Sequence, residues 1–369
     1  MNLILPRGHL APARPAAATL GLVDVDIHPR VPKLSDFDPW LSAAHRQRLR
    51  DYGVRLQHGY MRGTPYPKSQ PLACRRDAWP PGGGTPASDV EFVASQHLDH
   101  FGVDIGVLNP LGVGQGEQNA GFSAGLCHAA NEWQLAEWVA RDGRFRASVV
   151  VPYEDPEASA REIRLRAGDP RFAQVLMLSR TSQPGGNPHY WPIYQAAAEA
   201  GLPVAFHAFG YSGHTMTNGG WPSFYIEEVS EHATSCQSLV TSMVVEGLFE
   251  HLPGLRVVLI ECGFAWLPSL AWRLDKLHQT MAGEVPHLKL RPSDYIRRNI
   301  WLSTQPIEEP DRPEQLVQLM EWIGWDRILF ASDYPHWDFD DPRFAIPSYI
   351  GDERRAAIYG GNAKAVYGW

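Results

Sequence analysis

The chain has 369 residues, of which 44% are hydrophobic and 20% charged, and its formal net charge is −8. This composition is typical of a soluble globular enzyme, with enough residues for one large domain or two ordinary ones. The mildly acidic charge and the lack of a Lys/Arg cluster argue against a nucleic-acid partner. No apolar run is long enough to cross a bilayer.

The N-terminus and the cysteines indicate a cytoplasmic protein. Residues 1–21 are rich in Pro and Ala but lack a charged segment followed by a long apolar core, so we expect a loose arm and not a signal peptide. The cysteines have no CxxC spacing, which argues against a disulfide scaffold or a structural zinc site and fits a reducing compartment. They are Cys74, Cys127, Cys236 and Cys262.

Apolar runs that predict strands alternate with amphipathic stretches that predict helices. The expected strands are 22–28, 103–109, 145–151, 173–179, 203–207, 256–261, 299–303 and 327–332. Most of them are continuously apolar, which is typical of parallel strands covered on both faces. The expected helices are 124–140, 156–168, 189–200, 231–250, 264–280 and 312–322.

This alternation predicts an α/β fold, a (β/α)8 TIM-type barrel, in preference to an open doubly wound sheet. No GxGxxG motif follows the first strand, which counts against a dinucleotide-binding fold. We expect one barrel domain over residues 22–369. Residues 31–90, rich in Pro, Gly and aromatic residues, form a long insertion after the first strand, on the active-site face.

The first predicted strand contains polar residues at alternate positions. In the segment VDVDIHPR, residues 23–30, Asp24, Asp26 and His28 alternate with Val23, Val25 and Ile27. Because successive side chains on a strand point to opposite faces, these three polar residues are predicted to share one face.

Other strands also end in polar residues, at Arg180, His207, Glu261 and Asp333. Each has an ordinary explanation when taken alone. A strand-end acid often caps a turn or helix, so Glu261 could cap the helix starting near Phe264. His207 could be a core histidine and Arg180 a salt-bridge partner. Barrel enzymes, however, place catalytic groups at the carboxyl ends of their strands, so together these residues predict an active site.

The donor types predict a metal site in the mouth of the barrel. Asp26 and His28 stand two positions apart on one strand, so their donors are about 6–7 Å apart along the backbone. His207 and Asp333 would supply the opposite wall. Oxygen and imidazole donors of this kind bind divalent ions such as Zn²⁺ and Mn²⁺.

Several segments resemble the amidohydrolase superfamily, and more narrowly the amidohydrolase-2 family, which includes aminocarboxymuconate-semialdehyde and γ-resorcylate decarboxylases. The resemblance extends from about Leu22 to the C-terminus. It is carried by VDVDIHP, YWPIYQAAAEAGLPVAFH, EGLFEHLPGLRVVLIECGFAWLPSLAWRLD, ILFASDYPHWD and IYGGNAKAVYGW.

The resemblance implies which residues bind the metal. The last two positions of the family's D-x-H-x-H pattern fall on Asp26 and His28, its strand-five histidine on His207, and its strand-eight aspartate on Asp333. The fourth strand lacks the lysine that bridges two metals in many superfamily members, so we expect one ion, Zn²⁺ or Mn²⁺.

The catalytic group is less directly implied. Many relatives carry a catalytic histidine after strand six, where this chain has Glu261. Glu261 could be a base, a substrate contact or a brace for a neighbouring side chain. The histidine's role could instead pass to His232, or to His336 beside the strand-eight aspartate.

The leading hypothesis is a metal-dependent, non-oxidative decarboxylase acting on a small aromatic or unsaturated carboxylic acid. Asp333 would move a proton, and Arg180 would bind an anionic group. Further substrate contacts are expected from Trp221, Phe224 and His336. The alternative is a hydrolase of an amide, ester, lactone or C–C bond, with a metal-activated water and Asp333 as base. A silent barrel used only for binding is a third hypothesis. Relatives are commonly dimeric, so we expect a homodimer.

Overall fold

The computed structural model describes residues 21–54, 68–208, 215, 217 and 220–369. Its sheet has eight strands in the order β1 to β8, and each strand pairs in parallel with the next one along the chain. The strands are β1 (Leu22–Ile27), β2 (Val103–Leu108), β3 (Phe145–Val150), β4 (Phe172–Leu178), β5 (Val204–His207), β6 (Val257–Ile260), β7 (Ile300–Ser303) and β8 (Ile328–Leu329). The predicted barrel topology is therefore confirmed, although β8 is much shorter than expected.

The segment that follows β8 brings the sheet back to β1. The backbone nitrogen of Val25 donates to the carbonyl oxygen of Phe330 at 3.1 Å, and that of His28 donates to Tyr334 at 2.8 Å. Ile27 and Tyr334 also form a parallel bridge. These contacts nearly close the barrel, because they join β1 to the segment that follows β8.

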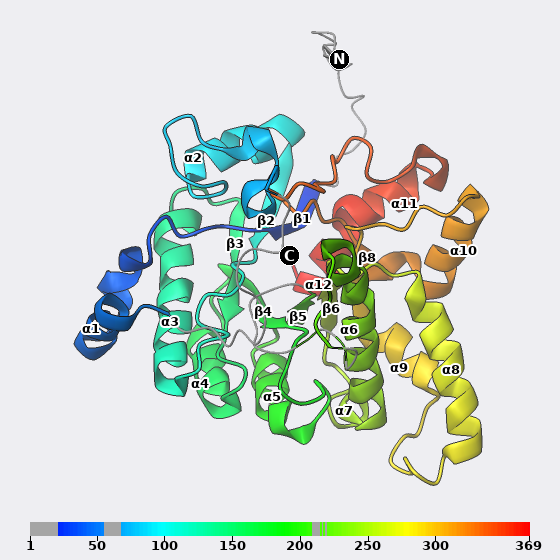
Figure 1. The fold of residues 1–369 in the computed structure, drawn as a ribbon. Helices are drawn as coiled ribbons and strands as arrows, with labels where there is room; N and C mark the ends of the chain where they lie inside the picture. The colour runs from blue at the N-terminus through cyan, green and yellow to red at the C-terminus, as the bar shows by residue number, and fades with distance from the viewer. Residues whose placement is uncertain (1–20, 55–67, 209–214, 216, 218–219) are drawn as a thin grey trace.

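Helices surround the strands (Figure 1). They are α1 (Ala43–Tyr52), α2 (Val90–Val93), α3 (Ala120–Trp133), α4 (Pro156–Arg166), α5 (Trp191–Glu199), α6 (Tyr225–Val245), α7 (Leu248–His251), α8 (Trp266–Met281), α9 (Pro292–Asn299), α10 (Pro313–Ile323), α11 (Asp352–Ala356) and α12 (Asn362–Tyr367). The predicted amphipathic stretches correspond to α3 to α8 and α10. Five short helices, α1, α2, α9, α11 and α12, were not predicted, because each is too short for a clear apolar period.

The segment between β1 and β2, residues 28–102, contains the predicted insertion, residues 31–90, and extends beyond it. It contains α1, α2 and the short helical segments η1 (Leu34–Trp40) and η4 (Ala94–Asp99). Part of the insertion, residues 55–67, and the predicted N-terminal arm up to residue 20 lie outside the described residues. Part of the insertion reaches the barrel mouth, because Cys74 forms a bridge with His336, just after β8.

The core has two layers. Side chains between the strands and the outer helices form the larger apolar cluster, and a smaller cluster fills the inside of the barrel. The inner cluster includes Val23 and Val25 of β1 and also Val366 and Tyr367 of α12. The C-terminal helix therefore packs against the barrel interior, close to where β1 begins.

All four cysteines are buried and free of disulfides. None of the helices that the described residues form combines the length and apolar character needed to cross a membrane.

Candidate metal centre

The carboxyl end of β1 supplies two side chains to the barrel mouth. Asp26 is fully buried and His28 is 3% exposed. The Nδ1 atom of His28 lies 2.9 Å from the backbone carbonyl oxygen of Asn109. Because a carbonyl oxygen only accepts hydrogen bonds, Nδ1 of the neutral ring carries the proton, and the lone pair is on Nε2. His28 therefore presents a metal-ligating nitrogen to the mouth.

The ends of β5 and β6 meet the β1 side chains. The Nε2 atom of His207 lies 3.0 Å from Oε2 of Glu261 and 3.5 Å from Oδ2 of Asp26. One ligand-type atom from each of Asp26, His28, His207 and Glu261 lies within 4.8 Å of the others. We call these residues the four-residue cluster. Three strands far apart in sequence thus direct oxygen and nitrogen donors to one point.

Asp333, after β8, lies directly beside this cluster. Its Oδ1 atom is 2.9 Å from Nε2 of His28 and 2.6 Å from Nδ1 of His336. The His336 ring stacks on His28, with 4.5 Å between the ring centroids. His28, Asp333 and His336 form a second group of ligand-type atoms that shares His28 with the first.

The backbone is strained at both acids that follow a strand. Glu261 has a φ of 58° and Asp333 a φ of 59°, in the left-handed region that residues with a Cβ rarely adopt. Such conformations persist where the surrounding structure enforces them, and they concentrate at functional sites. In both cases the unusual turn directs a carboxylate to the mouth.

Charge coupling shifts the pKa values of the site. Burial opposes protonation of His207, but the carboxylates of Glu261 and Asp26 raise its pKa to about 10. Burial also disfavours the charged form of Asp26, but His28 and His207 hold its pKa below the usual range. Burial, reinforced by the charge of Glu261, raises the pKa of Asp333 to about 7. A metal ion would displace protons from the histidines, so its binding should weaken at low pH.

The donor set fits a divalent ion. The buried Asp333 Oδ2 atom accepts no hydrogen bond from the described residues, and Asp26 Oδ2 and Glu261 Oε2 share one neighbour, His207 Nε2, at 3.5 and 3.0 Å. Buried carboxylate oxygens are costly unless they are paired or coordinate a metal. Carboxylate and imidazole donors suit Mn²⁺ and Zn²⁺. Three of the four predicted ligands, Asp26, His28 and His207, lie in the four-residue cluster. The fourth predicted ligand, Asp333, lies beside the cluster, and Glu261 takes the fourth place in it.

Glu261 is not the cap of α8 that its position suggested. The backbone nitrogens of Phe264 and Ala265 donate to the carboxylate of Glu308, at 3.0 Å each to Oε1. Glu261 faces the site, with its Oε1 atom 3.5 Å from Nδ1 of His232 on α6. Burial lowers the pKa of His232 to about 4, so this histidine is neutral at pH 7.

The prediction that Asp24 shares a face with Asp26 and His28 is wrong. The β1–β2 register shifts between Asp24 and Ile27, which interrupts the strict alternation. Asp24 accepts hydrogen bonds from the Ser332 backbone nitrogen at 2.9 Å and from His97 Nε2 at 2.7 Å. His97 lies on η4, outside the barrel. Asp24 therefore links β1 to η4 and to the segment after β8, and its side chain does not enter the mouth.

The predicted substrate contacts differ in their placement. Arg180 is buried and donates to Glu228 Oε1 at 3.0 Å. It is therefore a salt-bridge partner, which is the ordinary role considered for it in the sequence. Trp221 is half-buried ahead of α6. Phe224 is 69% exposed, so its side chain is largely in solvent. Contact between these residues and a substrate stays a prediction.

The sequence analysis missed Asn109, which follows β2. It is fully buried and contacts Asp26 through its side chain and His28 through its carbonyl oxygen. The available signal was its position, since it ends the apolar run VDIGVLN in the same way as the other strand-end polar residues.

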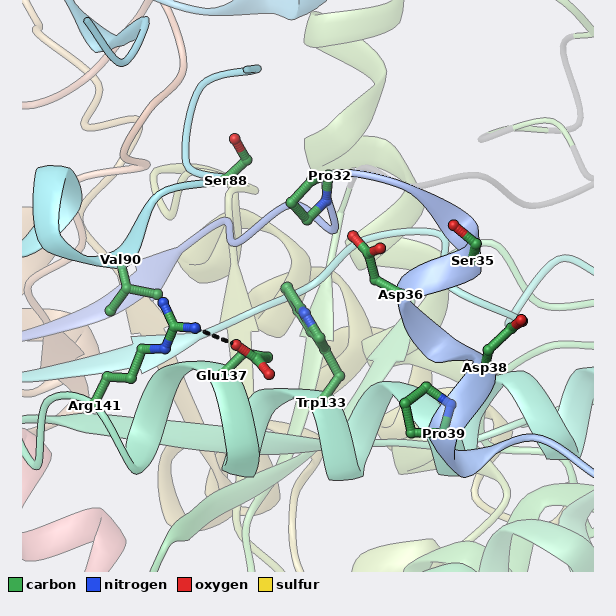
Figure 2. Close-up of a pocket in the computed structure, with 10 residues that line it drawn as sticks. All are labelled: Pro32, Ser35, Asp36, Asp38, Pro39, Ser88, Val90, Trp133, Glu137 and Arg141. Carbon is green, nitrogen blue, oxygen red and sulfur yellow. Dashed lines mark hydrogen bonds and ion pairs between the residues drawn. The ribbon is translucent and has the colours of Figure 1, made fainter. Parts of the chain in front are cut away.

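A separate hollow of about 570 Å³ lies on the outside, between η1 and the helical segment that begins with α3 (Figure 2). Asp36 and Asp38 border one side and Arg141 the other, and Arg141 pairs with Glu137 at 2.6 Å. It contains none of the residues at the strand ends, so the barrel mouth is the better candidate for the active site.

The amidohydrolase family model matches residues 23–369 of the chain. The chain belongs to the amidohydrolase family. The resemblance seen in the sequence motifs is thereby confirmed. The chain is 28% identical over 231 residues to γ-resorcylate decarboxylase of Rhodococcus jostii, an alignment that covers 57% of this amidohydrolase and 66% of the relative.

Solved structures share the fold of this amidohydrolase. The 5-carboxyvanillate decarboxylase of Sphingomonas paucimobilis is 24% identical, with a TM-score of 0.66 over 95% of this chain and 99% of that protein. A dihydroxybenzoic acid decarboxylase from a Polaromonas species is 21% identical, with a TM-score of 0.64 over 94% of this chain and 97% of that protein. That structure contains manganese and the inhibitor 2-nitroresorcinol.

Proposed function

We propose that this amidohydrolase is a metal-dependent, non-oxidative decarboxylase of a small aromatic carboxylic acid. The observation that carries the proposal is the convergence of the four-residue cluster at the barrel mouth, with Asp333 beside it. The similar proteins support the reaction type, because they are named decarboxylases of resorcylate and carboxyvanillate. The silent-barrel hypothesis does not explain why buried ligand-type atoms gather there.

Asp26, His28, His207 and Glu261 would hold one divalent ion. Mn²⁺ is the first candidate, because the mixed oxygen and nitrogen donors suit it and a protein of the same fold contains it. Zn²⁺ is the second. The β4 strand offers no lysine as a bridge, which favours a single ion. A bound ion would supply positive charge to hold the substrate carboxylate and a neighbouring hydroxyl or carbonyl oxygen.

Asp333 and His336 would handle the proton. The 2.6 Å separation of Asp333 Oδ1 and His336 Nδ1 allows one proton to be shared between them. We assign Asp333 to deliver this proton to the ring carbon that carries the carboxylate. The bond from that carbon to the carboxylate breaks, its electron pair takes the proton, and CO₂ leaves. His232 would hold Glu261 in place.

The test is CO₂ release by the purified, Mn²⁺-loaded protein from a panel of hydroxybenzoates and carboxyvanillate. We expect release from at least one acid, and none after the metal is stripped by a chelator. Stoichiometric Mn²⁺ without CO₂ from any acid would overturn the proposal. Reaction in ¹⁸O-labelled water separates the hydrolase alternative, because hydrolysis must place label in the product and decarboxylation need not.

A further inference from the structure

We infer that Asn109 is a positioning residue that sets the affinity of the metal centre by fixing Asp26 and His28 together; this inference rests on the proposed function. Asn109 directly follows β2 (Val103–Leu108), the neighbour of β1 in the barrel. Its backbone nitrogen donates to the carbonyl oxygen of Ile27 at 2.7 Å, which continues the pairing of the two strands to the point where the ligands begin.

Asn109 contacts one atom of each β1 ligand and leaves the other atom available. Its Nδ2 atom donates to Asp26 Oδ1 at 2.8 Å, and its carbonyl oxygen accepts from His28 Nδ1 at 2.9 Å. Asp26 Oδ2 and His28 Nε2 are the atoms left for an ion. A neutral amide stabilises the carboxylate without introducing a cation that would repel the metal.

The orientation of the Asn109 amide also fits its contacts with residues of β3 and β4. Its Oδ1 atom accepts from Ser148 Oγ and from Gln174 Nε2, at 2.9 Å each. Because the Asp26 carboxylate and the Val25 carbonyl oxygen, 3.0 Å from Nδ2, only accept hydrogen bonds, the NH₂ group must face them and the oxygen must face Ser148 and Gln174. Asn109, Ser148 and Gln174 are all fully buried, so water does not compete for these hydrogen bonds.

A further hydrogen bond connects Gln174 to the C-terminal helix. The hydroxyl of Tyr367, on α12, donates to Gln174 Oε1 at 2.7 Å. Tyr367, Gln174 and Asn109 therefore each donate to the next residue in one direction, and the series ends on Asp26. Hydrogen bonds aligned in this way polarise one another, particularly in a low-dielectric interior. Through this series, the C-terminal helix supports the metal centre from the far side of the barrel.

The decisive experiment is the dissociation constant of Mn²⁺ for chelator-stripped protein, measured by isothermal titration calorimetry. Asn109→Leu keeps the branched shape of the side chain but removes the donor, and we expect binding about 10–100-fold weaker. In an Asp26→Asn background the same substitution should have little further effect, because Asn109 acts through that carboxylate. Tyr367→Phe should weaken binding in the same direction by less than about tenfold.

Asn131→Leu is the matched control. Asn131 is also a fully buried asparagine, but its Nδ2 atom donates to Val150 and Glu162, at 3.0 Å each, on the outer side of the barrel. Asn131→Leu should lower the thermal midpoint and leave the Mn²⁺ dissociation constant unchanged.

The outcomes separate the inference from the proposed function. Wild-type protein that binds no Mn²⁺ would overturn both. Wild-type protein that binds Mn²⁺ while folded Asn109→Leu binds it equally well, or an additive effect in the Asp26→Asn background, would overturn the inference alone. If Asn109→Leu does not fold, Asn109→Ser and Tyr367→Phe decide, and unchanged affinity in both would reject the role of Asn109.

Discussion

The Nε2 atom of His207 lies 3.0 Å from the Oε2 atom of Glu261, so the ends of β5 and β6 join in one charge cluster. This contact gives Glu261 a place in the candidate metal centre. The resemblance to the amidohydrolase-2 family places a catalytic histidine at that position in many relatives. In this chain the position carries a negative charge, which would add a ligand and increase the attraction for a cation.

Glu261→Gln tests that role. The substitution keeps the shape of the side chain and removes its charge, so we expect Mn²⁺ to bind at least about tenfold more weakly. Titration calorimetry on stripped protein measures the effect. Glu199→Gln is the control, because Glu199 is an exposed residue paired with Arg164. Equal affinity in wild type and Glu261→Gln would remove Glu261 from the ligand set.

Asp333→Asn separates proton transfer from metal binding. If Asp333 supplies the proton, the variant keeps close to one Mn²⁺ per chain while kcat falls by about 10²–10⁴-fold. Metal analysis and CO₂ release on the same sample give both values. Loss of the metal together with activity would instead make Asp333 a ligand, as the sequence analysis expected.

Gly263→Ala should destabilise the protein. Gly263 has a φ of +60°, and an added Cβ would lie 2.3 Å from Glu308 Oε1, the carboxylate that caps α8. Left-handed strain and the displaced cap together should cost about 1–3 kcal/mol. Urea unfolding measures the loss. Gly254→Ala is the control, since its added Cβ meets no described atom within 4 Å. Equal midpoints for the two variants would contradict the argument.

A pH-dependent contribution to stability is expected between α3 and α4. Burial disfavours ionised Glu162, but hydrogen bonds from His128, Asn131 and Arg166 outweigh it and lower its pKa from 4.5 to about 2. A depressed carboxyl pKa stabilises the folded state above pH 4.5, and this stability is lost as the pH falls toward 2.

Glu162→Gln should therefore cost about 1–3 kcal/mol at pH 7 and progressively less below pH 4.5. Urea midpoints of wild type and variant between pH 3 and pH 7 give the difference directly. A difference that stays constant across this range would show that the charge of Glu162 is not what stabilises the contact.

The sequence predicted those parts of the site that depend on strand periodicity. His207 and Glu261 come at the ends of buried apolar runs, and the barrel topology requires such ends to meet at one mouth. The failure at Asp24 has a physical cause. The second of two register shifts between β1 and β2 separates Asp24, which contacts His97, from Asp26 and His28, and alternation alone cannot reveal such a shift.

Other features depended on partners that only the folded chain brings together. The capping of α8 by Glu308 joins residues more than forty positions apart, so the nearer Glu261 was the obvious candidate. Asn109 carried no recognisable motif. Its importance follows from its simultaneous contacts with Asp26 and His28, which depend on the β1–β2 pairing.

Electron paramagnetic resonance of Mn²⁺ added to stripped protein tests the metal centre most directly. We predict one tightly bound ion per chain in the wild type, and no tight binding in folded His207→Ala, because His207 is a member of the four-residue cluster. No tightly bound ion in the wild type, or unchanged binding in His207→Ala, would contradict the account.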